Sequence, residues 1–461
     1  MDYDVLILGG GIIGCSVAYE LSKYNLNIAV IEKDYDIADD ISLINTEIVY
    51  DGSECEDKFL STIEHKGNSM LDEITSKFNV PFKRVGSIKI ANENKAIDII
   101  EGIYKRAKER NINDIYLMDK NDVKDIEPNI SLDFKKAVYS PNIGVIAPYD
   151  LAIAYAEVAF DNGATFRLEE EVTDIKKIVN GFKVTTNKNK FSCRVVVNTI
   201  PGEYNTLDSD IKSNGQKESD VHYLILNDRS KPFSNSIITA ISDEGDMIKY
   251  IPAAGNESLI AINKKGTLKF NDAVRLAKKV VPSIDKDAVN SIYHEKSRNN
   301  LVIIDDNENY NGYIRVCGDH YATVTMTPAI ASMICETIVS NLTCSKNKNF
   351  IDKRREFYKF KDMSDEERNE VIAIDKKYGK ITCLCNLISE GEIVDSIRRP
   401  LGARTVEGVK RRTGATFGSC HGAHCISKII YILARELNKK PTDIVEDSKN
   451  SKVLASRIKE F

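Results

Sequence analysis

The sequence lacks the features of several large classes of protein. Lys and Arg number 64 against 69 for Asp and Glu, so a net charge of -5 leaves no basic surface for nucleic acid. No apolar run approaches the roughly 20 residues that a membrane-spanning helix needs. The apolar start of the chain has no Lys or Arg before it, unlike a secretory signal. We therefore expect a cytoplasmic protein of about two or three domains that acts on a small molecule or another protein.

A disulfide framework is also not expected, although the chain has 10 cysteines, because cytoplasmic thiols are kept reduced. Most of them are scattered and are expected to be buried free thiols: Cys15, Cys55, Cys193, Cys317, Cys335 and Cys344. The remaining cysteines are clustered near the C-terminus.

The start of the chain has the pattern of a dinucleotide-binding unit. An apolar strand at 5–8 leads into Gly9-x-Gly11-x-x-Gly14, a helical pattern, and a second apolar strand that ends at Glu32. Gly9 permits a tight turn, Gly11 lets a pyrophosphate approach the helix, and Gly14 allows close packing of helix on strand. Glu32 can accept hydrogen bonds from an adenosine ribose, and its charge disfavours NADP. FAD and NAD both remain open, and the N-terminal position of the motif favours FAD.

The middle of the chain alternates between helical and strand patterns. Helices are expected at 96–110 and 150–162. The expected strands are 87–91, 137–140, 165–168, 181–186 and 194–199.

Several segments, in order along the chain, resemble one family of flavoproteins. They are DYDVLILGGGIIG, FKRVGSIKIA, DVKDIEPNI, AVYSPNIGVIAPYDLAIAYAEVAFDNGA, EEEVTDI and YIRVCGDHYATVTMTPAIASMI. The family is that of the D-amino-acid-oxidase-like oxidoreductases, in the branch of L-2-hydroxyglutarate dehydrogenases and anaerobic glycerol-3-phosphate dehydrogenases. The resemblance implies FAD and the oxidation of a carbon that bears a hydroxyl or amino group.

The clustered cysteines form a second motif. Cys383-x-Cys385 and Cys420-x4-Cys425 are separated by 34 residues. The spacing, with SEGEIVDSIRR, TVEGVKRRTGATFGSC and HGAHC, resembles the 2Fe-2S module of bacterioferritin-associated ferredoxin, which also ends anaerobic glycerol-3-phosphate dehydrogenases. Four thiolates complete a two-iron cluster.

Other interpretations of these cysteines remain open. Zinc also accepts four thiolates, although a single residue separates Cys383 from Cys385, and zinc sites usually have gaps of about two to four. Unligated thiols are the third alternative. His421 and His424 are expected to be solvated or to donate hydrogen bonds. A capping box at Ser389 and a Thr405 cap are expected to begin two helices in this segment.

Together these resemblances imply an α/β and α+β protein. A Rossmann-like FAD-binding domain is interleaved with an antiparallel-sheet substrate domain and followed by a small helical 2Fe-2S domain. The implied boundaries are 1–80, 145–215 and 300–342 for the FAD-binding domain, 81–144 and 216–299 for the substrate domain, 343–378 for a helical linker, and 379–461 for the 2Fe-2S domain. Further residues assigned to the cofactor are Lys33, Ser42, Asn45, Val172 and Gly318.

Loops expected near the flavin depart from the family pattern. Residues 39–52 read DDISLINTEIVYDG, whereas members of the family usually have a run like GTSKANSGIVHAG at this place. They place larger or charged residues where small ones or a histidine are usual: Asp40, Glu47, Tyr50 and Asp51. In GDHYATVT, 318–325, His320 and Tyr321 replace small residues of a run like GIDSPGLT, and VVNTIPGEY, 196–204, replaces VINAAGLY. We expect these bulky residues to narrow or occlude the substrate pocket.

A flavin takes two electrons as a hydride, and a 2Fe-2S cluster passes one electron at a time. A chain with both can therefore pass electrons from the reduced flavin, one at a time, to an external acceptor. Arg298 lies where the family has an arginine facing the substrate, with a surface position as the alternative. Tyr250 and His320 are the other candidate catalytic residues. We expect a cation to bind a substrate carboxylate or phosphate and a base to take a proton.

The sequence therefore supports two functions. The first is an FAD-dependent dehydrogenase of a small hydroxy acid, glycerol 3-phosphate or amino acid, working with a protein electron acceptor or a partner flavoprotein subunit. The second is an electron-transfer or scaffold subunit that has lost small-substrate oxidation. Either protein is expected in the cytoplasm, with any membrane attachment made through a partner.

Overall fold

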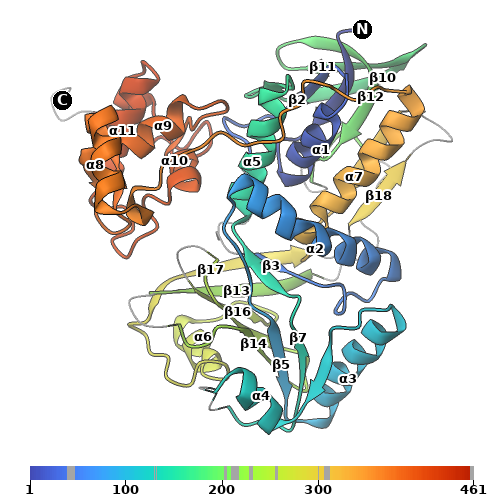
Figure 1. Cartoon of the computed structure of the whole chain (residues 1–461), viewed down its shortest axis with the longest axis vertical. Coiled ribbons are helices and arrows are strands. Elements are labelled where there is room, and N and C mark those ends of the chain that lie inside the picture. The colour runs from blue at the N-terminus through green and yellow to red at the C-terminus, as the bar shows by residue number, and fades with distance from the viewer. Residues whose placement is uncertain are drawn as a thin grey trace.

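The computed structural model has a body with two large β-sheets and a smaller helical unit beside it (Figure 1). The structure describes residues 1–38, 47–128, 130, 132–201, 205–208, 218–227, 232–254, 258–298, 301–305 and 312–456. These layers of sheet and helix confirm the expected fold class.

The first sheet carries the glycine motif. Its strands are, in spatial order, β10 (Val172–Ile178), β11 (Gly181–Thr186), β12 (Lys190–Asn198), β1 (Tyr3–Leu8), β2 (Ile28–Ile31) and β9 (Thr165–Arg167), with β19 (Tyr313–Cys317) between β12 and β18 (Val302–Asp305). β1 pairs in parallel with β2 and with β12. Both faces of β1 are covered by apolar side chains, which explains the unbroken apolar run at 5–8.

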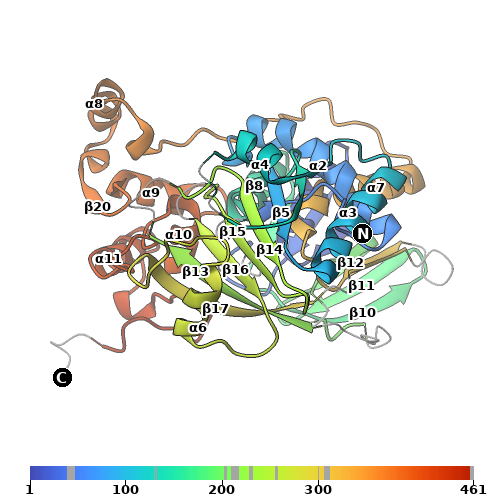
Figure 2. The same cartoon turned by 90° about the horizontal axis from the view of Figure 1, so that it is seen from below.

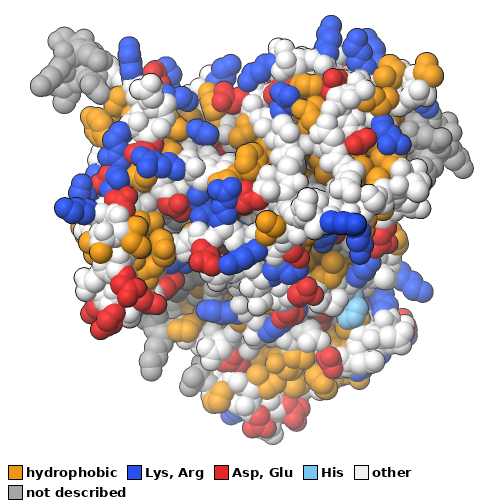
Figure 3. Space-filling view, turned by 45° about the horizontal axis from the view of Figure 1, so that its top comes forward, with side chains coloured by type: hydrophobic (Ala, Val, Ile, Leu, Met, Phe, Trp, Pro, Cys, Tyr) orange, Lys and Arg blue, Asp and Glu red, His pale blue; other side chains and the backbone are white. Residues whose placement is uncertain are grey.

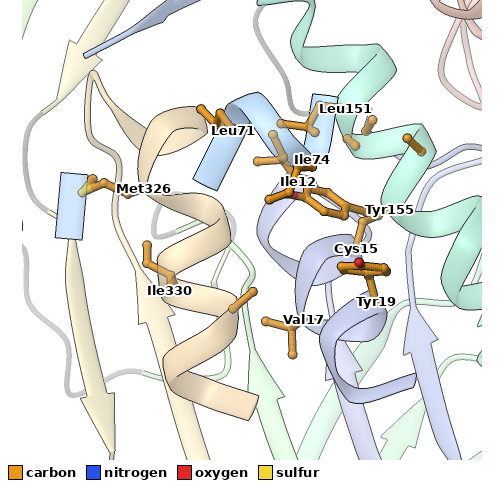
Figure 4. Packing of buried hydrophobic residues seen from close by; sticks show 14 of the residues in the cluster. Ile12, Cys15, Val17, Tyr19, Leu71, Ile74, Leu151, Tyr155, Met326 and Ile330 are labelled. Atoms are coloured by element: carbon orange, nitrogen blue, oxygen red, sulfur yellow. The ribbon is translucent and has the colours of Figure 1, made fainter. Parts of the chain in front are cut away.

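Four helices form the core against this sheet. They are α1 (Ile12–Ser22), α2 (Lys58–Phe78), α5 (Pro148–Asp161) and α7 (Thr323–Leu342). Figure 4 shows side chains of all four meeting, among them Tyr19, Leu71, Tyr155 and Ile330. By length and composition α7 could cross a membrane, but 61% of its apolar window is buried inside the protein. A core position accounts for its composition.

The second sheet lies below the first in Figure 1. Its order is β17 (Val289–Arg298), β13 (Glu218–Leu226), β16 (Leu259–Asn263), β15 (Met247–Ile251), β14 (Ile237–Ile241), β5 (Ser87–Ala91), β7 (Lys136–Ser140) and β6 (Tyr116–Met118). The β5–β14 pair is parallel and the others are antiparallel. Figures 1 and 2 show helices α3 (Asn94–Glu109), α4 (Lys120–Ile126) and α6 (Phe270–Ala277) around it. A small sheet of β3 (Glu47–Val49), β8 (Gly144–Ile146) and β4 (Phe82–Arg84) joins the two bodies.

The segment 343–378 differs from the expected helical linker. Its helical parts are α8 (Asp365–Ile374) and the short 3-10 turns η1 (Phe360–Asp362) and η2 (Lys376–Gly379). Residues 350–359, all of them described, form no helix. Arg354 and Arg355 there bind Glu157 and Asp161 of α5, each at 2.6 Å, so ion pairs to α5 hold this stretch extended.

The C-terminal unit is a compact helical domain with its own apolar core. It contains β20 (Ile381–Cys383), β21 (Ile388–Ser389), α9 (Glu390–Arg398), α10 (Val406–Thr413) and α11 (Ile426–Glu436). The Ser389–Glu392 capping box begins α9, and the Thr405 side chain accepts from the Gly408 amide to begin α10. Both helix starts confirm the sequence prediction.

Gly67 marks the closest approach of α2 to α7, because a Cβ there would lie 2.0 Å from the Thr325 carbonyl oxygen. We expect Gly67→Ala to lower the free energy of unfolding by about 1–3 kcal/mol, since the helices must separate. Gly102→Ala on α3 is the matched control: its nearest atom is Arg106 Nη1 at 3.5 Å, and it should stabilise by up to about 1 kcal/mol. Urea unfolding measures both. Equal losses would contradict the packing argument.

Candidate functional site

The glycine motif forms a tight turn between β1 and α1. Gly9 adopts a left-handed φ of 100°, and a Cβ on Gly14 would lie 2.0 Å from the Gly9 carbonyl oxygen. Gly11 precedes α1 without a side-chain cap, and nothing lies within 4 Å of where its Cβ would be. The helix N-terminus is therefore open to a pyrophosphate, as the motif predicts.

Glu32 is held beside this turn. It is buried, and its carboxylate accepts from the Gly10 amide at 2.6 Å and from the Asp34 amide at 2.9 Å. A carboxylate has further lone pairs, so ribose hydroxyls can still donate to it. Lys33 is exposed and lies 3.7 Å from Asp34.

Of the other predicted cofactor residues, the structure describes Val172 and Gly318. Val172 is buried at the start of β10, opposite Thr186. Gly318 follows β19 with a left-handed φ of 83°. Ser42, Asn45 and the side chain of Arg298 lie outside the described residues, so their roles stay predictions.

A cluster of polar side chains lies where the inner face of the second sheet meets α2 and β3. Lys89 and Lys249 share this face because both lie opposite Thr239, on either side of β14. The Lys89 ammonium is buried and pairs with Glu54 at 2.7 Å, whereas Lys249 donates to the Tyr50 hydroxyl at 3.3 Å. Burial opposes ionisation of Glu54, but the two lysines outweigh it and hold its pKa below the usual value.

The neighbouring carboxyl groups retain their protons. Burial, with the charge of Glu295, raises the pKa of Glu47 to about 8. Burial, with the charge of Glu54, raises the pKa of Glu64 to about 8 as well. Tyr50 lies among these groups, and burial together with their charges raises its pKa well above the usual value. Tyr50 is therefore a neutral hydrogen-bonding phenol.

His320 is a hydrogen-bond donor at this junction. Its Nδ1 accepts from the Ala322 amide at 3.1 Å, so Nε2 carries the hydrogen and faces Cys55 Sγ at 4.0 Å. Burial lowers the pKa of His320 to about 4, which keeps the ring neutral. Next to it, Tyr321 packs edge-on against Tyr50 with ring centroids 4.8 Å apart. These bulky substitutions therefore pack across the domain junction.

Tyr250 is not brought together with His320. It is adjacent to Lys249 on β15, and side chains alternate along a strand, so it points to the opposite face. There it is 1% exposed, within the apolar cluster on the face of the second sheet that is turned away from Lys249. Its ring centroid lies 5.8 Å from that of Phe233. Lys249 is thus the residue of this strand that the sequence argument missed. Period-two alternation over 247–251 could have indicated it.

The clustered cysteines converge as two pairs. The Cys383 and Cys425 thiols lie close enough to shift each other's pKa, as do those of Cys385 and Cys420. The first pair is buried, whereas Cys385 is exposed and Cys420 half-buried. Two thiols for each metal ion is the arrangement that a two-iron cluster requires.

The surroundings favour one thiolate in each pair. The Cys425 thiol and the nearby amides of Asn386, Thr416 and Cys385 lower the pKa of Cys383 to about 5 against the effect of burial, whereas the pKa of Cys425 is raised. In the other pair the pKa of Cys420 is lowered and that of Cys385 is raised. Within the described part of the chain, no group of three or more His, Cys, Asp or Glu side chains is placed to hold one metal ion. The thiols are therefore arranged as pairs rather than gathered around one point.

Buried arginines fix the cysteine-bearing domain to the body. Arg412 of α10 binds both Asp36 oxygens, at 2.6 and 2.7 Å, and both side chains are at least nine-tenths buried. Arg354 and Arg399 bind the two oxygens of Glu157, at 2.6 and 2.9 Å. Although burial opposes its ionisation, these arginines hold the pKa of Glu157 below the usual value.

A cavity of about 310 Å³ lies where the body, the linker and this domain meet. Asn386 and Gly414, which neighbour the cysteine loops, line it on one side, and Ala147 lines it on another. Ala147 directly follows β8, which pairs with the Glu47 strand. The cysteine loops and the domain junction therefore border one cavity.

The cysteine pairs can be tested through the metal content. We expect Cys420→Ser to lose most of the iron, about two atoms per chain in the parent protein, and with it the iron–sulfur absorption. Cys344→Ser, at a half-buried free thiol, is the control and should keep both. Iron analysis and visible spectra of anaerobically prepared protein measure the outcome. Stoichiometric zinc in the parent protein would contradict the assignment.

Comparison with known proteins identifies both parts of the chain. The family model described as FAD dependent oxidoreductase matches residues 4–337, and that of the BFD-like [2Fe-2S] binding domain matches residues 381–435. A glycerol 3-phosphate dehydrogenase of Caloramator mitchellensis is 33% identical over 99% of both chains. A mitochondrial L-2-hydroxyglutarate dehydrogenase of Nematostella vectensis is 29% identical over 44% of this chain and 47% of its own.

Solved structures share the fold of the body. The L-alpha-glycerophosphate oxidase of Mycoplasma pneumoniae, with FAD bound, superposes with a TM-score of 0.67 at 20% identity, over 77% of this chain and 99% of that one. L-proline dehydrogenase from P. horikoshii gives 0.63 at 18% identity, over 75% and 94%. FAD and a 2Fe-2S cluster are thus the cofactors, in place of the NAD and zinc alternatives. The chain belongs to the FAD-dependent oxidoreductase family and carries a BFD-like 2Fe-2S domain after its catalytic body.

Proposed function

We propose that the chain is a dehydrogenase of a small anionic alcohol, with glycerol 3-phosphate and then a 2-hydroxy acid as the first substrates to test and an amino acid as the third. The observation that carries the proposal is Lys249. Its ammonium donates to the neutral Tyr50 phenol and lies near Glu54, which pairs directly with Lys89 at 2.7 Å, so Lys249 keeps hydrogen-bond donors for an anion. The names of two relatives, a glycerol 3-phosphate dehydrogenase and an L-2-hydroxyglutarate dehydrogenase, support this substrate class.

The side chains at the junction have complementary roles in this proposal. Lys249 binds the substrate anion, and His320 donates its Nε2 hydrogen to a substrate oxygen. Glu47, whose pKa of about 8 is close to physiological pH, takes the hydroxyl proton when ionised. When bound, FAD supplies the two-electron acceptor for the substrate hydride. Arg298 stays a candidate for a second cation, and Tyr250 is left out because it lies on the sheet face turned away from Lys249.

The electron acceptor is proposed to be an external protein, either a carrier or a partner flavoprotein subunit. The 2Fe-2S domain supports this, since its cluster exchanges single electrons and one of its cysteines is exposed. We place the protein in the cytoplasm, with any membrane contact made by the partner.

A second function is favoured by the packed junction. The Tyr50 and Tyr321 rings, together with His320, occupy space where the family has small residues or a histidine. If no substrate enters, the chain is an electron-transfer or scaffold subunit of an oxidoreductase complex.

Anaerobic mixing with each substrate distinguishes the two functions. We expect glycerol 3-phosphate or a 2-hydroxy acid to bleach the flavin absorption, and Lys249→Met to raise the KM by about tenfold or more, since a charge-assisted contact is lost. Lys264→Met is the control, because that lysine pairs with Asp246 and should leave the KM unchanged. If dithionite reduces the flavin and no substrate of these classes does, the dehydrogenase proposal fails and the second function stands.

The role of Glu47 predicts a pH profile. A general base acts when deprotonated, so kcat/KM should rise with pH and level off above about 8. Glu47→Gln should lower kcat by about 100-fold or more and remove this rise, while FAD stays bound. Other titratable groups face Glu47: Glu295, Tyr50, Tyr149 and Tyr223. Glu295→Gln is therefore the control, and it should shift the rise to lower pH without removing it. An unchanged profile in Glu47→Gln would rule out this base.

A further inference from the structure

The two cysteine pairs of the 2Fe-2S domain differ in their exposure to solvent. Cys383 and Cys425 lie in the apolar core of the domain, whereas Cys385 is exposed and Cys420 half-buried. The hairpin between β20 and β21 carries Cys385 and packs against the loop that carries Cys420: a Cβ on Gly418 would lie 2.2 Å from the Cys385 Cβ. A cluster on these cysteines therefore has one edge toward the domain core and the other toward solvent.

The loops around the outer edge are poor in charged side chains, although Lys410 of α10 lies over the Phe417 ring at 4.7 Å. Residues 381–389 and 413–427, which form the two loops, contain no Asp, Glu, Lys or Arg, although 29% of the whole chain is charged. Figure 3 shows charged side chains of both signs spread over one face of the molecule. Such a gap in the charge pattern marks a surface that tolerates desolvation.

Large apolar side chains point outward from the same hairpin. Leu384 is 64% exposed and Leu387 is 47% exposed, on either side of Cys385. Leu387 adopts a left-handed φ of 52°, which a branched side chain seldom does. The backbone thus keeps an unfavourable conformation here while the leucine stays in water. We call the exposed residues of both loops that precede α11 the cluster face: Leu384, Cys385, Leu387, His421, Ala423 and His424.

We propose that the cluster face is the docking site of a one-electron carrier protein whose own redox centre reaches its surface within an apolar rim. This inference rests on the proposed function for the source of the electrons. Electron transfer weakens steeply with distance, so the carrier has to cover the exposed cysteine edge. Apolar contact with the two leucines fits such a partner, whereas a small diffusible acceptor needs no apolar rim.

The electron balance sets the number of encounters. Oxidation of one substrate hydroxyl to a carbonyl releases two electrons and two protons. Each docked carrier is reduced by one electron, so two oxidised carriers dock in turn and the protons go to solvent.

The test compares a cluster-face variant with a control of the same chemistry. Leu384→Glu/Leu387→Glu places charge on the face, and Ile374→Glu places it on α8 of the linker, where Ile374 is 75% exposed. The holoprotein is reduced with dithionite, which makes the test independent of the substrate. Flavodoxin, a plant-type ferredoxin, cytochrome c and the small oxidant ferricyanide are then the acceptors. Calorimetry with oxidised carrier and oxidised holoprotein measures docking without electron transfer.

We expect the parent protein and Ile374→Glu to bind and reduce at least one carrier. The double variant should do so about tenfold more weakly, with its iron content and its reaction with ferricyanide unchanged. The proposal is overturned if the double variant binds carriers as the parent does, or if the parent reacts only with ferricyanide. A failed substrate with normal carrier docking would refute the proposed function alone.

Discussion

The buried pair between Arg412 and Asp36 is the contact on which the arrangement of the two redox sites depends. It ties α10 of the 2Fe-2S domain to the loop that follows β2, and Ala38 of that loop donates to the Gly10 carbonyl in the glycine turn at 2.9 Å. Breaking a buried pair on one side costs about 3–5 kcal/mol, because a charge is left without its partner. The dinucleotide turn and the cysteine domain are therefore held by one loop.

The domain junction shows how the loops that differ from the family pattern change its chemistry. Lys89 and Lys249 approach from the sheet and meet Glu54 and Tyr50, and Glu47 and Glu64 lie near Tyr50. In a poorly hydrated environment each carboxyl stays ionised only where a cation compensates it. Glu54 has the two lysines, whereas Glu47 and Glu64 lack such compensation and retain protons near neutral pH.

Features set by local interactions were the ones that the sequence predicted well. The glycine turn, the Ser389 capping box and the Thr405 cap each depend on contacts within a few residues, and all three are present as expected. The linker was mispredicted because its conformation depends on contacts with residues far away in the sequence. Its charged pattern suggests a helix, but distant acidic residues on α5 bind Arg354 and Arg355 and keep it extended.

The sequence by itself indicated the family and both cofactors, through the resemblance that its glycine and cysteine motifs carry, and the four cysteines stay the predicted ligands. Only the tertiary structure decided which side chains meet at the junction. Tyr250 and Lys249 are neighbours in the chain but point to opposite faces of β15, and Tyr50 reaches Lys249 from another body. Contacts of this kind come from the packing of segments far apart in sequence, which no local pattern specifies.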